Sequence, residues 1–356
     1  MLSIQSMAQN SSTPNSDMRR QGIIAIEDNQ FANQYYANEA SHWRGQVALN
    51  EKDEYAWLNL YKATRFTNYT EHDRDISTSR QNDLDALLAK MKKAIPESFA
   101  YNYSAYLNGN KSNQSFTYLE KAYKQGTEVN ELWDDMLSKA VIQSNQSEIT
   151  KFSNLLSENH VYNSAEVTYN RNVLSSVEQN GILITNGNVD TYPVIMMQQL
   201  QNYRKDVNVL CLEWLGNETY SNTVSDWLGL KTDKKITLPD IMASKSSRPL
   251  YLSLTVPPDD IKKYSDNLYC TGLAMKYSKT PLDNLAVLSS NWERLFDKST
   301  LQASEGLNKN YLVPLVLLKD YYSQKGNTSA KAETSQQIEQ IATVFGLSKA
   351  IQKHKD

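Results

Sequence analysis

The chain has 356 residues and a formal net charge of −3, with 40% hydrophobic and 22% charged residues. This composition is typical of globular proteins and excludes a chain that is disordered throughout, while the length allows two or three domains. Lys and Arg do not outnumber Asp and Glu, so no nucleic-acid partner is indicated. The longest apolar run, near 311–318, is far shorter than the roughly 20 residues of a membrane-spanning helix. We therefore expect no transmembrane span of the chain's own.

The segment 1–25, which begins MLSIQSMAQNSSTPNS, predicts no folded element. Ser6-Met7-Ala8 followed by Gln9 resembles the small-residue end of a secretory signal, although the charged and long apolar regions of such a signal are missing. The segment is therefore either a signal remnant or a disordered tail. We favour the remnant and expect export to the periplasm, with a cytoplasmic protein as the alternative.

Residues 26–179 repeat one pattern, in which an amphipathic helix ends, a short break follows and a new helix begins with aromatic residues. The four copies span 41–66, 87–107, 116–137 and 152–174. Helix pairs of about 34 residues with Ala and large aromatics at the packing positions are typical of tetratricopeptide repeats. We predict a tetratricopeptide-like domain over 26–179, interrupted by a loop at 68–80. A generic helical bundle is the alternative.

Aromatic side chains are frequent in this helical region. They suit two roles, because they can fill the space between packed helices or form a surface for a partner. We expect packing to use most of them. The candidates for partner binding are Trp43, Trp57, Tyr101 and Tyr103.

Near residue 180 the pattern changes to that of an α/β domain, which we predict over 180–298. A strand at 181–185, a helix at 192–203 and a strand at 207–215 form a βαβ unit, which implies parallel pairing. A helix is predicted at 221–230, and the segment between the later strands reads as a helical turn or a hairpin loop. Further strands are predicted at 248–256 and 267–278. These elements predict a small, mostly parallel sheet of four strands.

After Pro281 the pattern returns to helices, predicted at 282–297, 308–324 and 330–353. The last two suggest a C-terminal helical pair within 299–356. The predicted fold class is therefore α/β plus all-α: N-terminal tetratricopeptide-like repeats, a small α/β domain and C-terminal helices.

Residues that commonly carry chemistry are scarce. Cys211 and Cys270 lie in predicted strands, and they read as buried thiols or, in an oxidising compartment, as a bridged pair. The four histidines have no metal-ligand spacing, and the Gly-rich phosphate signatures and the nucleophile-elbow pattern are missing. We expect no metal and no cofactor.

The stretch GILITNGNVDTYP, at 181–193, is the one candidate ligand site. It offers Asn186, Asn188, Asp190, Thr191 and Tyr192 directly after a buried strand, where open α/β sheets bind ligands. The alternative is a turn, because Asn-Gly favours turns, Asp190 or Thr191 can cap a helix, and proline fits a first helical turn. We favour the turn.

Three phrases in order carry a resemblance to a known family. They are Thr185-Asn186-Gly187-Asn188-Val189-Asp190-Thr191-Tyr192-Pro193, then Arg204-Lys205-Asp206-Val207, then Pro249-Leu250-Tyr251 to Thr255-Val256 with Gly272-Leu273-Ala274. This stretch resembles the soluble C-terminal part of glycosyltransferase-like membrane proteins of Gram-negative envelopes, which are relatives of protein O-mannosyltransferases. Asn188 replaces an acid of the family phrase, and the family's membrane core is absent.

The resemblance implies an α/β fold, an accompanying helical-repeat region and an envelope setting; glycosyl transfer, which belongs to the membrane core, does not carry over. Asp190 has no second titratable group near it in sequence, as general acid–base catalysis normally needs. We therefore expect a non-catalytic scaffold whose partners are other envelope or membrane proteins. The alternative is an accessory that binds or modifies a glycan or nucleotide-sugar-like molecule through the α/β domain.

Overall fold

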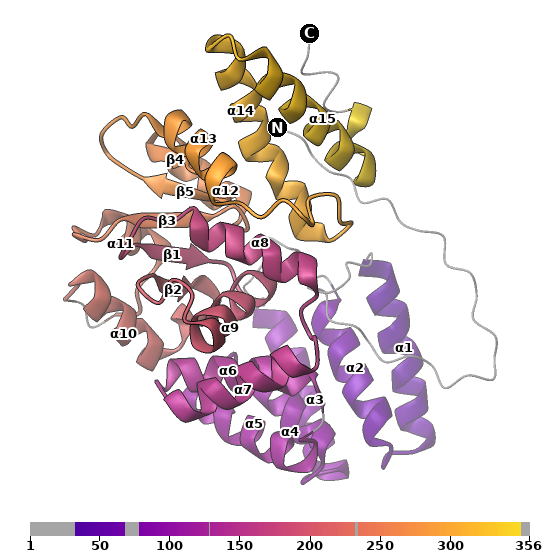
Figure 1. The fold of residues 1–356 in the computed structure, drawn as a ribbon. Helices are drawn as coiled ribbons and strands as arrows, with labels where there is room; N and C mark the ends of the chain where they lie inside the picture. Colours follow the sequence, from indigo (N-terminus) through magenta and orange to yellow (C-terminus); the bar gives the residue numbers. More distant parts are fainter. Residues whose placement is uncertain (1–32, 68–77, 128, 232–233, 350–356) are drawn as a thin grey trace. The chain divides into compact units, whose positions relative to one another are not determined.

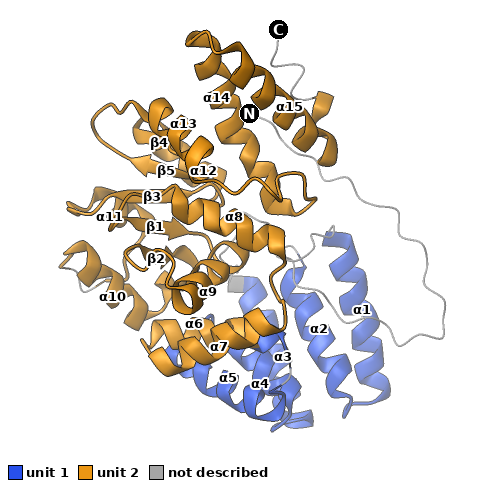
Figure 2. Cartoon of the chain, viewed as in Figure 1, with its two compact units in different colours: residues 1–132 blue, residues 133–356 orange. Residues whose placement is uncertain are grey.

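The computed structural model describes residues 33–67, 78–127, 129–231 and 234–349 (Figure 1). The predicted tail at 1–25 and most of the predicted loop at 68–80 lie outside these residues. The end of that loop was predicted wrongly, since helix α3 already begins at Thr78. The chain forms two compact units, residues 1–132 and 133–356 (Figure 2). This division differs from the expected change of domain near residue 180.

The described part of unit 1 is helical. Its helices are α1 (Asn33–Leu49), α2 (Glu54–Phe66), α3 (Thr78–Ala94), α4 (Phe99–Asn108) and α5 (Asn113–Gln125). Short polar side chains start three of them, because each accepts a hydrogen bond from a backbone N–H of the first turn. These caps are Asp53, Ser98 and Ser112.

Short connections join α1 to α2, α3 to α4 and α4 to α5 in unit 1. α1 packs on α2, α4 packs on α5, and α2 also contacts α3 and α4. Alanines such as Ala56 and Ala63 are buried between large aromatic rings, which lets the helix axes approach closely. The predicted phrases at 41–66 and 87–107 each cover the end of one helix and the start of the next, as expected.

Unit 2 begins within α6 (Glu131–Ile142), followed by α7 (Gln146–Glu158) and α8 (Ser164–Ser175). A mixed sheet of five strands follows, in the order β2-β1-β3-β5-β4. Its strands are β1 (Ile182–Thr185), β2 (Asn208–Cys211), β3 (Leu250–Ser253), β4 (Leu268–Cys270) and β5 (Ala274–Tyr277). The pairings β1–β2 and β1–β3 are parallel, whereas β3–β5 and β4–β5 are antiparallel.

The sheet corrects two strand predictions. The segment 267–278 is not one strand but the hairpin β4–β5, so the sheet has five strands rather than four. Gly272 lies in its turn, where a Cβ atom would come within 2.1 Å of Ser176 Oγ on the segment after α8. The strand predicted at 207–215 ends at Cys211, and the short helix η2 (Leu212–Gly216) follows because its two buried apolar side chains, Trp214 and Leu215, turn toward the interior.

The remaining helices of unit 2 are α9 (Tyr192–Gln201), α10 (Glu218–Leu228), α11 (Leu238–Ala243), α12 (Pro258–Lys263), α13 (Asn284–Arg294), α14 (Leu312–Gln324) and α15 (Thr328–Val344). They lie around the sheet or, for the last two, beyond α13 (Figure 1). One apolar core joins α8, α9, the sheet and the last three helices. α12 shows that the segment before β4 is a helical turn, not a hairpin loop.

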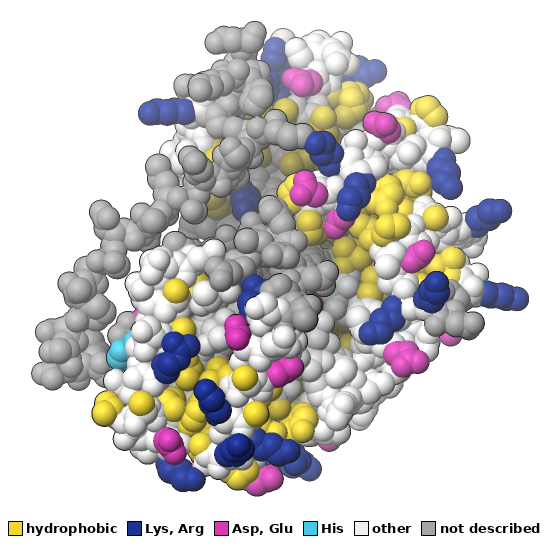
Figure 3. All heavy atoms as spheres, turned by 180° about the vertical axis from the view of Figure 1, so that it is seen from behind, with side chains coloured by type: hydrophobic (Ala, Val, Ile, Leu, Met, Phe, Trp, Pro, Cys, Tyr) yellow, Lys and Arg dark blue, Asp and Glu magenta, His cyan; other side chains and the backbone are white. Residues whose placement is uncertain are grey.

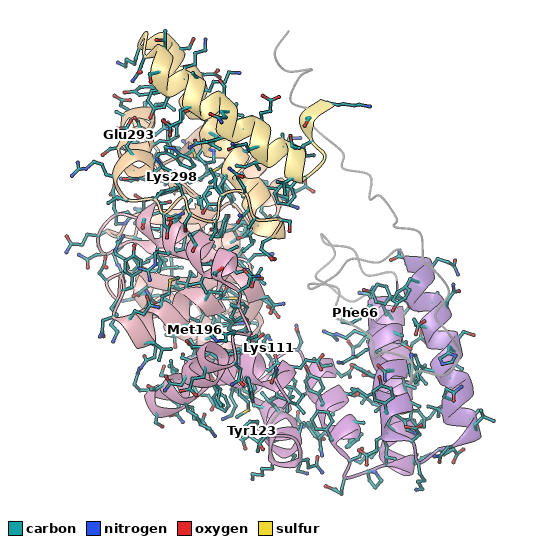
Figure 4. All side chains as sticks on the ribbon, turned by 45° about the vertical axis from the view of Figure 1, so that its right-hand side comes forward. Phe66, Lys111, Tyr123, Met196, Glu293 and Lys298 are labelled. Atoms are coloured by element: carbon teal, nitrogen blue, oxygen red, sulfur yellow. The ribbon has the colours of Figure 1, made fainter. Side chains whose placement is uncertain are left out.

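The C-terminal helices are tied to one another by polar contacts as well as by this core. α14 packs against both α13 and α15. The Tyr322 hydroxyl on α14 donates to Glu293 Oε1 on α13 at 2.8 Å. After α13, Lys298 Nζ lies 5.4 Å from the centre of the Trp292 ring of the same helix. Glu293 and Lys298 are labelled in Figure 4. The predicted helical pair at the C-terminus is therefore α14 and α15.

The cysteines are both free and buried. Cys211 lies in β2 and Cys270 in β4, the strands at opposite edges of the sheet. A bridge between them would require the sheet to come apart, so they are buried thiols in this fold. In the described part of the chain, no helix combines the length and apolar character needed to cross a bilayer.

Candidate functional site

The candidate site lies at the carboxyl end of β1. This strand is central to the parallel part of the sheet, with β2 on one side and β3 on the other. The chain leaves β1 toward β2 and later returns to the other side of β1, which creates a topological switch point where ligands bind in many α/β proteins. The loop after β1 contains the short helix η1 (Asn188–Asp190) and leads directly into α9.

Asp190 is the only carboxylate of this loop, and it is 1% exposed. It accepts hydrogen bonds from the backbone N–H groups of Asn186, at 2.7 Å, and Gly187, at 2.9 Å. The hydroxyls of Thr191, at 3.0 Å, and Thr255 also donate to it. Burial raises the pKa of Asp190, and these hydrogen bonds oppose the rise. The carboxyl group therefore joins the loop after β1 to the loop after β3.

Neither Asp190 nor Thr191 caps the start of α9 with its side chain, although Asp190 does accept from the N–H of Gly187, the N-cap of the short helix η1. Thr191 is the N-cap of α9, but its side chain makes no capping hydrogen bond. Its backbone is already in the helical region, so the hydroxyl turns back and lies 2.8 Å from Thr185 Oγ1. Asp190 likewise bonds to the residues before it. Both side chains stabilise the loop itself rather than the helix end.

Only two of the five predicted ligand-binding side chains reach the surface. Asp190, Thr191 and Tyr192 are buried, and the Tyr192 ring packs 5.9 Å from that of Trp214. Asn186 and Asn188 are half-buried. Asn188 has a φ of 50°, a left-handed conformation that Asn tolerates better than most residues.

Residues distant in sequence complete the loop, and sequence reasoning did not connect them to it. Thr255 arrives from the end of β3, and Asn170 of α8 donates from Nδ2 to the Val189 carbonyl at 2.7 Å. Glu213 lies over Gly187, where an added Cβ would be 2.5 Å from Glu213 Oε2. The phrase ending in Thr255-Val256 was the one signal that could have indicated the first of these contacts.

The second family-like phrase has a structural role at the opposite, amino end of the parallel strands. Arg204 donates to the carbonyls of Leu174 and Val177, both at 2.8 Å, at the end of α8. It also forms an ion pair with Asp206 at 2.9 Å, and Asp206 accepts from the N–H of Asn180. The hydrogen bonds from Arg204 are the main reason that the pKa of Asp206 is lowered to about 2.

Arg248 completes this arginine clamp from the start of β3. Its guanidinium donates to the carbonyls of Asn180 at 2.6 Å, Gly181 at 3.1 Å and Asp206 at 3.1 Å. The two arginines therefore fix the chain where it enters β1. The clamp explains the Arg-x-Asp-Val phrase without a ligand.

The four aromatic residues named as candidates for partner binding are Trp43, Trp57, Tyr101 and Tyr103. All of them are buried in unit 1. The indole N–H of Trp43 donates to Glu39 Oε2 at 3.1 Å, and that of Trp57 donates to the Glu51 carbonyl at 2.9 Å. Their side chains contribute to packing, so a partner surface on this unit would be formed by other residues. Among the residues that the structure describes, no three His, Cys, Asp or Glu side chains are grouped as metal ligands.

Comparison with known protein families gives a match to part of the chain. A family model described as TMEM260-associated domain 2 matches residues 166–226. The matched stretch runs from α8 through the βαβ unit into α10, so it includes the candidate loop and Arg204. The family is related to protein O-mannosyltransferases, which agrees in part with the resemblance seen in the sequence. No curated protein and no solved structure matches the chain.

Proposed function

We propose that this protein is a non-catalytic interaction protein of a bacterial cell-envelope complex, in which the helix pairs act as a repeat scaffold. The observation that supports it most is the state of Asp190. A carboxylate that works as an acid or base must reach a substrate, whereas Asp190 is buried and accepts from two backbone and two side-chain donors. The Asp190 carboxylate, which is the candidate acid or base of this loop, is therefore used to stabilise the loop.

The helices of unit 1 provide the second support. Their aromatic side chains are used in packing, and their outer faces carry polar residues such as Arg44 and Gln114. Stacked helix pairs expose extended surfaces of this kind, on which other proteins bind. Acidic and basic side chains are interspersed on the face seen in Figure 3, which suits a protein partner better than a nucleic acid.

Site-specific photocrosslinking in the natural host tests this function. A photoreactive amino acid replaces Arg44 or Gln114 on unit 1 or, as the comparison, Asn188 in the candidate loop of unit 2. We expect one discrete crosslinked envelope protein from a unit 1 position and none from Asn188. Crosslinking from Asn188 alone would contradict the scaffold and favour the ligand-binding accessory.

The periplasmic location is part of the same proposal and has its own test. The natural gene product is expressed from its own chromosomal locus and followed by osmotic-shock fractionation with periplasmic and cytosolic markers. We expect it in the envelope fraction. Recovery with the cytosolic marker would contradict the envelope location. The interaction role is tested separately by the crosslinking experiment.

A further inference from the structure

A groove lies on unit 2 away from the candidate loop. Its volume is about 580 Å³, and it is bordered by the end of α10, the end of α11 and the segment that leads into β3. Because Arg248 at its edge precedes β3, the groove is at the amino end of the parallel strands, opposite the loop after β1. A space of this size accommodates a small organic ligand.

One wall of the groove is the continuous segment Ser244-Lys245-Ser246-Ser247-Arg248. It carries three serine hydroxyls and two cations, and the Ser246 hydroxyl is already used by the backbone of Arg248, to whose carbonyl it donates and from whose N–H it accepts. In the described residues, neither Lys245 nor Arg248 has a carboxylate within ion-pair distance. The three acceptors of Arg248 are neutral carbonyls, which hold the guanidinium in place without cancelling its charge. The hydroxyls of Ser244 and Ser247 and the Nη1 group of Arg248, which does not take part in these three hydrogen bonds, are donors suited to a phosphate group.

The opposite wall is apolar. Trp227 is half-exposed there, next to Leu228 and Leu230. The Trp227 ring lies edge-on to that of Tyr220, 6.4 Å away. The Tyr220 hydroxyl accepts from the N–H of Cys211 and donates to the Val209 carbonyl, so the aromatic pair is anchored to the edge of β2. The indole therefore offers a fixed surface for the flat or apolar part of a ligand.

Negative charge at the groove opposes anion binding and must be weighed. Asp226 lines the rim, and α10 ends here with the partial negative charge of a helix C-terminus, equivalent to about half a unit. The two positive charges of Lys245 and Arg248 exceed the combined negative charge of Asp226 and the helix end. A third cation, exposed Lys231, follows directly after the lining residue Leu230. Among the described residues that line or directly adjoin the groove, the balance is positive, in a chain whose net charge is −3.

We propose that this groove binds a phosphate ester, with the phosphate on the Ser244–Arg248 segment and the rest of the ligand against Trp227. The same chemistry is presented by a free phosphorylated metabolite and by a phosphomonoester lipid headgroup. The inference does not depend on the scaffold function, because it concerns another face of unit 2.

Fluorine NMR of the full chain labelled with fluorotryptophan tests the proposal, and the Trp227→Phe variant identifies the Trp227 signal. The probes are inorganic phosphate, uridine monophosphate and vesicles that contain phosphatidic acid, with chloride at equal ionic strength and phosphatidylcholine vesicles as references. We expect a saturable shift or broadening of the Trp227 signal with phosphate-bearing probes. A response to uridine monophosphate assigns the ligand to the free metabolites, and a response to phosphatidic acid alone assigns it to a lipid headgroup.

A pair of charge-reversal variants makes the test specific. Lys245→Glu should weaken the response about tenfold, because it replaces a direct phosphate donor with a like charge. Lys279→Glu makes the same change in net charge at another exposed site of unit 2 and should leave the response unchanged. No saturable response from any phosphate probe, or an equal loss in both variants, would overturn the proposal. Both lysines are exposed, and an unchanged melting temperature confirms that each variant is folded.

Discussion

Single residues explain why the loop after β1 has one conformation. Asp190 accepts two backbone and two side-chain hydrogen bonds in the interior, and each donor would be unsatisfied without it. A buried donor left without a partner costs about 1–3 kcal/mol. The carboxyl group therefore stabilises the fold through its hydrogen bonds, although burial disfavours its charged form and raises its pKa.

Asp190→Asn should lower the free energy of unfolding by about 1–3 kcal/mol, because one amide N–H₂ group would face the backbone donors of Asn186 or Gly187. Urea denaturation followed by circular dichroism measures the change. Asp226→Asn, at an exposed carboxylate of α10, is the matched control and should change stability by less than about 0.5 kcal/mol. Equal stability of Asp190→Asn and the wild type would show that the hydrogen bonds do not hold the loop.

Asp206 and Asp190 should respond to pH with opposite signs. The pKa of Asp206 is lowered to about 2, so its contribution to stability is present above the unfolded-state value of about 3.9 and is lost as the pH falls toward 2. The pKa of Asp190 is raised, so its titration favours the fold below about 3.9 and this contribution is lost as the pH rises through the folded-state pKa.

Denaturant midpoints of the wild type and Asp206→Asn between pH 2 and 6 isolate the Asp206 contribution. The difference between the two proteins should be largest above pH 4 and should shrink toward pH 2 (about the range set by the two pKa values). A difference that does not change over this range would contradict an ion pair between Arg204 and Asp206 that stabilises the fold.

At the scale of elements, side chains that pack closely against the backbone determine where a strand ends. The hairpin β4–β5 turns at Gly272, and the Ser176 hydroxyl, which accepts from the N–H of Leu273, occupies the space of a Cβ atom. Phe296 lies 2.7 Å from that same position. Side chains after α8 and α13 therefore fix the turn that separates the two strands.

Gly272→Ala should lower the free energy of unfolding by about 1–3 kcal/mol, because the added methyl group displaces Ser176 and Phe296 from a packed interior. Thermal melting of Gly272→Ala beside Gly306→Ala is the measurement. Gly306 has open space around its Cβ position, so that control should melt close to the wild type. Equal melting of the two variants would contradict the tight approach between the hairpin and the α8 segment.

The same element shows what sequence patterns can and cannot predict. Apolar periodicity located most of the helices and the βαβ unit, because those signals are local, but it missed the short helix α11. The split at Gly272 depends on Ser176, and the closure of the candidate loop depends on Thr255, both distant in sequence. Propensity alone also predicted a capping role for Thr191, whereas its hydroxyl bonds to Thr185 in β1. Long-range contacts override local preferences at these positions.

At the scale of the whole molecule, the chain forms two compact units with different contents. Unit 1 is helical in its described part, and unit 2 combines a mixed sheet with helices. We propose that the helical surface binds a protein partner and that the loop after β1 has a structural role. These roles can be separated, because the half-buried amides of Asn186 and Asn188 can be removed without touching unit 1.

The most direct test measures the yield of the Arg44 photocrosslink in the wild type and in an Asn186→Ala, Asn188→Gly double variant. Glycine removes the Asn188 amide while retaining the left-handed backbone at φ 50°. We expect equal crosslink yields in the two backgrounds. A variant with an unchanged melting temperature that has lost the crosslink would contradict this expectation, because the loop would then be a binding site.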